Sequence, residues 1–220
     1  GLEAHADLRV TVPRGRAVDI CLAVGRMRAQ NVDGTVRLDT RSGAVEAREM
    51  AGELTIDTGS GSVDVEGMRG DLVIDTGSGG VRVADVEGES LSIDTGSGSV
   101  VAEEVLADRV AIDTGSGAID LLRSRAREVE LDTGSGSVEA ELAGDVDSVV
   151  VDTGSGGVTL RLSDEVGARL VVDTGSGGID TDLPVTVNRS RRGRLEGQLG
   201  DGQGLIQVDV GSGGVRILRW

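Results

Sequence analysis

Hydrophobic positions recur along this chain with a period near 20 residues and a fixed phase around one short motif. Asp-Thr-Gly-Ser-Gly occurs in seven intact copies, and Asp39 and Asp209 begin two degenerate ones. The intact copies begin at Asp57, Asp75, Asp94, Asp113, Asp132, Asp152 and Asp173. The steps between the nine aspartates are 18, 18, 19, 19, 19, 20, 21 and 36 residues. A repeat of this length indicates an array in which each unit stacks on the next.

Apolar and polar residues alternate on both sides of the motif. The positions three and one before each aspartate are apolar in all nine copies, as at Leu54 and Ile56. The position six after it is always Val or Ile, as at Val63. This alternation around a glycine-rich centre predicts two strands joined by a tight corner. Each aspartate is out of phase with its apolar neighbours, so we expect its side chain to point outward.

A third apolar position, at Met50, Met68, Val86 and Val105, predicts a short third side in each repeat. The differences in repeat length all fall on this side, which is therefore expected to tolerate loops. Equivalent strands of successive repeats should pair in parallel. The fold class predicted is all-β, a single-stranded parallel β-helix (β-solenoid) of about ten rungs of 18–21 residues. We expect a right-handed coil by analogy with other crossovers between parallel strands.

The whole chain, residues 1–220, is predicted to form one β-solenoid domain. Residues 1–34 are expected to form an atypical N-terminal rung, built from a strand at 8–12 and a strand at 18–24. Residues 35–183 carry the regular repeats, and residues 184–220 are predicted to form degenerate C-terminal rungs.

The last step, of 36 residues, is twice 18, so it suggests a hidden rung. Val185 and Val187 would form its first strand, and Leu195 and Leu199 would return the chain to the interior.

Composition narrows the classes of partner. The formal net charge of −16 argues against nucleic acid and anionic membranes, and it favours a cationic peptide, a cationic polymer or a metal ion. No apolar run approaches the ~20 residues needed to span a bilayer. Because the chain begins with Gly1 rather than Met, we expect it to be part of a longer protein. The single cysteine, Cys21, is predicted to be a small, unreactive filler residue.

Asp-Thr-Gly-Ser is also the active-site signature of pepsin-like aspartic proteases. That mechanism needs two aspartates facing each other across a cleft between two lobes, whereas these copies should form a ladder along one edge. The favoured interpretation is structural, with each carboxylate accepting a hydrogen bond from a corner amide. The alternative is a Ca²⁺-binding ladder, since Ca²⁺ prefers carboxylate and carbonyl oxygens. An ice-binding row of threonines is a weaker alternative.

The second candidate site is a group of basic residues. Arg189, Arg191, Arg192 and Arg194 form the only dense basic cluster of an acidic chain, and they are predicted to be a solvated loop or a partner contact. No transition-metal site or cofactor is predicted, because His5 and Cys21 are the only residues of their kinds.

The chain resembles a bacterial adhesin-like β-strand-repeat family, the domain of unknown function 4097. The features that carry the resemblance are the Leu-Arg-Val-Thr-Val-Pro-Arg-Gly segment at residues 8–15, the repeats themselves, and the ending at residues 195–217. The resemblance implies a β-solenoid, a bacterial envelope or extracytoplasmic setting ahead of a cytoplasmic one, and no catalytic residues.

We therefore expect a non-enzymatic structural or interaction domain whose partner is an unknown protein or envelope component. A solenoid with open ends is also expected to favour end-to-end or edge association between copies. The alternatives are a Ca²⁺-dependent binding module and, with less support, a carbohydrate-active β-helix enzyme.

Overall fold

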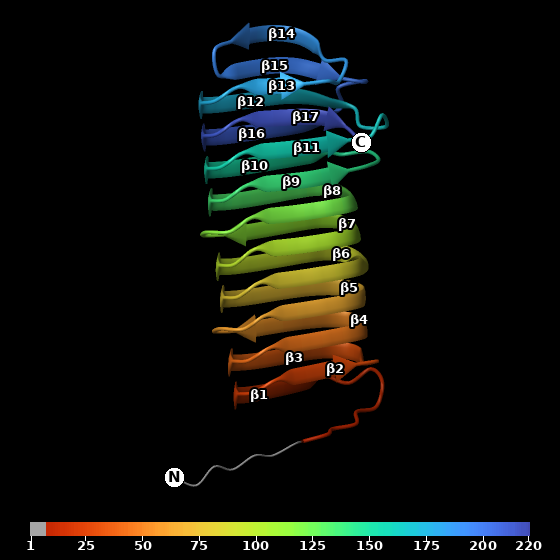
Figure 1. Ribbon diagram of the computed structural model, residues 1–220. Helices are drawn as coiled ribbons and strands as arrows, with labels where there is room; N and C mark the ends of the chain where they lie inside the picture. The colour runs from red at the N-terminus through yellow and green to blue at the C-terminus, as the bar shows by residue number, and fades with distance from the viewer. Residues whose placement is uncertain (1–7) are drawn as a thin grey trace.

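The computed structural model describes residues 8–220 and shows one tall stack of β-strands wound around a common axis (Figure 1). Within this range no helix is long and apolar enough to cross a membrane. The strands, in chain order, are β1 (Val18–Val24), β2 (Met27–Gln30), β3 (Asp33–Ser42), β4 (Val45–Thr58), β5 (Val63–Ser78), β6 (Val81–Ser97), β7 (Val100–Thr114), β8 (Ile119–Ser135), β9 (Val138–Leu142), β10 (Ser148–Ser155), β11 (Val158–Leu162), β12 (Ala168–Ser176), β13 (Ile179–Thr181), β14 (Thr186–Arg191), β15 (Arg194–Leu199), β16 (Gly204–Ser212) and β17 (Val215–Arg219).

Equivalent residues of neighbouring coils lie side by side in parallel register, which confirms the predicted parallel β-solenoid. Eight consecutive turns run from Cys21 to Asp173, and one further coil is inserted between the last two levels. The corner positions therefore form one line, in spatial order Cys21, Asp39, Asp57, Asp75, Asp94, Asp113, Asp132, Asp152, Asp209 and Asp173.

The interior is a narrow column of Val, Ile, Leu, Met and Ala that runs the length of the stack. The apolar positions before and after each corner are buried, as are Met50, Met68, Val86 and Val105 on the third side. Branched aliphatic side chains fill this lumen without large rings, in agreement with a sequence that has no Phe and no Tyr.

Adjacent backbones meet at the motif corner too closely for a side chain. Gly79 has a φ of 145°, and a Cβ at this position would lie 2.1 Å from the carbonyl oxygen of Gly61 in the preceding coil. The next residue, Gly80, meets no atom closer than 3.7 Å. The second glycine of the motif is therefore required by the coil beneath it, whereas the position after it also accepts Ser or Ala in other copies.

The edge between the second strand and the third side is built differently. There the chain adopts left-handed backbone angles at equivalent positions of successive coils. These positions are Asn31 (φ 55°), Glu49 (φ 53°), Gly67 (φ 71°), Asp85 (φ 54°), Glu104 (φ 56°) and Arg123 (φ 51°). Only one of the six is glycine, because a Cβ at Gly67 would meet no atom closer than 3.6 Å. Below, this set is called the left-handed edge.

The C-terminal part contains no hidden parallel rung, so that expectation is wrong. Residues 186–199 form an antiparallel hairpin instead, with β15 paired to β12 and β14 paired to β15. The chain turns back at Gly193, where φ is 75°. Leu195 and Leu199 are buried as expected, and the strand that carries them, β15, lies near the upper end of the stack in Figure 1.

The N-terminal coil also differs from expectation. Residues 8–12 form no strand, and Leu8 is exposed. β1 forms as predicted and pairs only with β3 among the described residues, which leaves Ile20 and Leu22 partly exposed. Cys21 is exposed beside Asp19 and is not a buried filler, because it occupies the outward-facing corner position that Asp39 holds in the next coil.

Candidate functional site

The corner aspartates, called here the aspartate column, lie on the outer edge of the stack. Each points away from the lumen because the residue before it and the threonine after it point inward, as Ile56 and Thr58 do around Asp57. Parallel strands in register place successive aspartates about 4.8 Å apart. The structure thus brings the seven predicted aspartates into one column and adds Asp39 and Asp209 to it.

The predicted hydrogen bonds from corner amides to these carboxylates do not form within residues 8–220. The amides bond to backbone carbonyls of neighbouring coils instead. Gly59 N donates to the oxygen of Thr40 (3.0 Å), and Gly61 N donates to the oxygen of Ser78 (3.0 Å). Since the stacking itself satisfies the corner amides, the carboxylates are left facing solvent.

Arginines pair with the column at both of its ends. Arg37 Nη2 lies 3.9 Å from Asp39 Oδ2 and 3.7 Å from Asp57 Oδ2. At the other end, Arg194 Nη1 lies 2.5 Å from Asp173 Oδ2. No described cation forms an ion pair with the aspartates between these ends, which are Asp75, Asp94, Asp113, Asp132, Asp152 and Asp209.

The carboxylates in the middle of the column repel one another. Two unit charges about 4.8 Å apart repel by roughly 1 kcal/mol in water. The pKa of Asp132 is raised, first by partial desolvation and then by the negative charges of Asp113, Asp152 and Glu130. The column therefore favours any group that adds positive charge beside it.

A column of threonines lies directly behind the aspartates and is buried. In the C-terminal half each hydroxyl donates to a glycine carbonyl of the neighbouring coil, as Thr133 Oγ1 does to Gly117 (3.0 Å). The hydroxyls of the N-terminal half have no such partner; these are Thr40, Thr58, Thr76 and Thr95. Val210 replaces threonine in the inserted coil and is equally buried, so the position needs the shape more than the hydroxyl.

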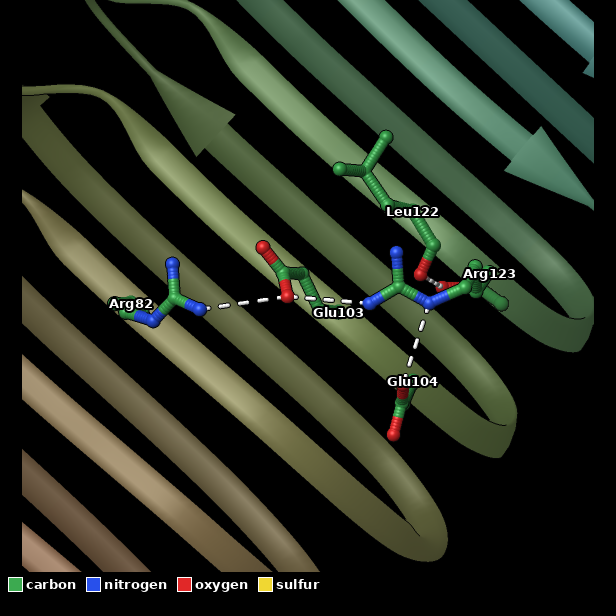
Figure 2. Close-up of polar contacts among 6 residues, drawn as sticks. Arg82, Glu103, Glu104, Leu122 and Arg123 are labelled. Atoms are coloured by element: carbon green, nitrogen blue, oxygen red, sulfur yellow. Dashed lines mark hydrogen bonds and ion pairs between the residues drawn. The ribbon is translucent and has the colours of Figure 1, made fainter.

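A charged network at the left-handed edge was not predicted from the sequence (Figure 2). Glu103 Oε2 lies 3.4 Å from Arg82 Nη2 and 3.2 Å from Arg123 Nη2. Arg123 Nε also donates to Glu104 Oε1 at 3.3 Å. These residues are close only because the coils stack, since Arg82 and Glu103 belong to adjacent repeats. A signal for one of these pairs was available in the sequence, since Glu104 and Arg123 carry opposite charges at equivalent positions of successive repeats.

A family model described as Toastrack DUF4097 matches residues 6–218, nearly the entire chain. The chain belongs to the Toastrack family. This membership agrees with the β-solenoid fold and leaves the function open, because the family is a domain of unknown function. Searches of curated proteins and of solved structures find no match.

A shallow groove of about 880 Å³ runs along the third side of this Toastrack domain. Its floor consists of small residues at equivalent positions, namely Gly70, Gly88, Ala107 and Ala126. Its walls carry both signs of charge and the half-exposed Leu106. The groove contains no aromatic residue and no histidine or cysteine. It therefore lacks the stacking groups that sugar-binding clefts often use.

The predicted arginine cluster is divided by the Toastrack hairpin. Arg194 turns toward the stack and pairs with Asp173 and Glu196, so its role is structural. Arg189 and Arg191 lie on the fully exposed strand β14, and Arg192 is in the turn. The part of the chain that the structure describes holds no group of three or more His, Cys, Asp or Glu arranged for a metal ion. His5 lies outside that part.

Proposed function

We propose that this Toastrack domain is a non-catalytic interaction scaffold that binds a cationic partner along its aspartate column. The observation that carries the proposal is the run of column carboxylates without ion pairs between Arg37 and Arg194. A binding surface of this type attracts its partner through the summed field of many charges.

The distribution of charge along the chain supports this proposal. Residues 51–183 hold 28 acidic residues and 8 arginines, whereas residues 184–220 hold 3 acidic residues and 6 arginines. The acidic surface is thus concentrated on the middle of the stack, and the C-terminal hairpin is basic. A cationic partner would be guided to the middle coils.

A catalytic role has less support. The column aspartates stand in one row on a convex edge, so they do not form the facing pair that an aspartic protease requires. The groove on the third side places no pair of carboxylates around an enclosed space. An envelope setting in bacteria is the part of this proposal that rests on the family resemblance alone.

The test is binding of a fluorescent nona-arginine peptide at low and at physiological salt. Replacing five column residues with Asn should weaken binding at least tenfold and flatten its salt dependence. The five residues are Asp75, Asp94, Asp113, Asp132 and Asp152. A matched control neutralises five acidic residues elsewhere, at Asp64, Asp85, Glu89, Asp108 and Glu165. Equal losses in both variants would show that net charge, and not the column, attracts the peptide.

Calcium is the second candidate ligand, because a row of carboxylates supplies the oxygen donors that Ca²⁺ prefers. The discriminating measurement is the melting temperature with Ca²⁺, with EDTA, and with NaCl of matched ionic strength. A ligand that binds only the folded state raises the melting temperature as its concentration increases. A shift greater than that caused by NaCl, and lost in the five-residue column variant, would favour calcium.

A further inference from the structure

The last coil of the chain lies inside the stack and not at its end. β16 pairs in parallel with β10 on one side and with β12 on the other, and Asp209 is in register with both Asp152 and Asp173. β17 likewise pairs with β11 and with β13. In Figure 1 the dark-blue strands β16 and β17 separate coils that are consecutive in the sequence.

Both faces of the inserted coil are fully used. Its backbone forms hydrogen bonds with the coils on both sides, since Val158 N donates to Gly214 O (3.0 Å) and Val215 N donates to Gly178 O (2.9 Å). Its side chains complete the lumen, where five apolar residues are buried: Ile206, Val208, Val210, Val215 and Ile217. Without residues 204–219, two unpaired strand edges and an open section of lumen would face each other.

Only a short linker connects the inserted coil to the rest of the chain. Residues 200–203 pass around the end of β12, where Ala168 pairs with Leu199 on one side and with Gly204 on the other. The linker contains two glycines in left-handed conformation, Gly200 (φ 51°) and Gly202 (φ 71°). Because glycine also adopts other conformations freely, this linker is suited to act as a hinge.

We propose that the space between β10–β11 and β12–β13 is a strand-acceptor site, and that a second copy of this chain can fill it with its own residues 204–219. Both copies carry the same segment and the same site, so reciprocal exchange reproduces every contact of the monomer and closes a symmetric dimer. The interface of this dimer is the register already observed within one chain.

Cysteine trapping in the full chain tests the proposal. Two single variants, Asp152→Cys and Asp209→Cys, are made with Cys21→Ser, purified separately, mixed at high concentration and warmed to just below melting before oxidation. Residues paired across parallel strands are about 4.8 Å apart, within the range of about 4.4–6.8 Å between the Cα atoms of a disulfide. Exchange predicts a disulfide-linked heterodimer of the two variants.

The control mixture pairs Asp209→Cys with Asp94→Cys, whose neighbours in the column are Asp75 and Asp113. Exchange predicts no heterodimer above background in this mixture. Equal cross-linking in both mixtures, or none in either, would overturn the proposal. A second full-length variant lacks Asp201 and Gly202, and its shortened hinge should shift the protein from monomer to dimer on size-exclusion chromatography. A folded variant that stays monomeric at all concentrations would also contradict exchange.

Discussion

The chain turns in different ways at two edges of the same coil, the motif corner and the left-handed edge. At the second glycine of the motif corner the backbones of neighbouring coils are so close that a Cβ would overlap a carbonyl oxygen. At the left-handed edge the chain has unusual backbone angles but leaves open space, and five of its six residues carry side chains. A glycine that recurs in every repeat therefore indicates close approach between coils, and not merely a turn.

Replacing a corner glycine should have the largest effect. In Gly79→Ala the added methyl group must displace the carbonyl of Gly61, which lies 2.1 Å from its ideal position, or separate two coils. We expect a loss of at least about 3 kcal/mol in the free energy of unfolding, measured by urea denaturation. The matched control is Gly80→Ala in the same corner, which should change stability by less than about 0.5 kcal/mol. Similar losses for the two variants would refute the close-approach argument.

The same substitution at the left-handed edge should cost less. Gly67→Ala introduces a side chain at φ 71° with no atom closer than 3.6 Å, so the cost is that of the backbone angle alone, about 1–2 kcal/mol. Denaturation beside Gly79→Ala measures the difference between the two edges directly. A cost for Gly67→Ala as great as that for Gly79→Ala would mean that the edges are equally crowded.

The reverse substitution should stabilise the left-handed edge. Asp85→Gly relieves the strain of a non-glycine residue at φ 54°, and the gain is partly offset by the greater freedom of glycine in the unfolded chain. We expect a net gain of about 0.5 kcal/mol, visible as a small rise in melting temperature. The control Asp64→Gly lies near the start of β5, outside the left-handed edge, and should lower the melting temperature. A loss at both positions would contradict the strain argument.

These contrasts also show what could be read from the sequence. The strands, the corner, the inward apolar positions and the outward aspartates follow from spacing, because a fixed period of side-chain direction repeats in every coil. The corner hydrogen bonds were predicted wrongly, since the spacing of Asp-Thr-Gly-Ser does not reveal that the corner amides bond to the next coil. Insertion of residues 204–219 below β12 was not predictable either, because all the coils share the same register and each fits beside any other.

Substitutions of the buried threonines behind the corner should have smaller effects on stability than Gly79→Ala. Thr133 donates to Gly117, so Thr133→Val removes a hydrogen bond and should cost about 1 kcal/mol. Thr58 has no partner for its buried hydroxyl, so Thr58→Val should be neutral or stabilising by up to about 1 kcal/mol. Paired denaturation curves of the two variants check the sign. Equal losses of stability in the two variants would show that the two halves of the threonine column are alike in solution.

The smallest effect on stability should come from removing one outward-facing charge of the aspartate column. Partial desolvation, and after it the like charges of the neighbouring carboxylates, raise the pKa of Asp132 above its ordinary value of 3.8, so the ionised side chain opposes folding at neutral pH. Asp132→Asn should therefore melt slightly higher than the wild type at pH 7. As the pH falls through the raised pKa the wild-type carboxyl becomes protonated in the folded state first, and the advantage of the variant should shrink.

Asp57→Asn is the matched control for this charge, because it lies in the same column but is paired with Arg37 at 3.7 Å. Removing its charge leaves the arginine without that partner, so we expect no rise in melting temperature at pH 7. If both variants were stabilised equally, Arg37 would contribute no measurable screening at its end of the column. If neither were stabilised, salt and solvent would already screen the repulsion, and the argument for a cationic partner on the column would weaken with it.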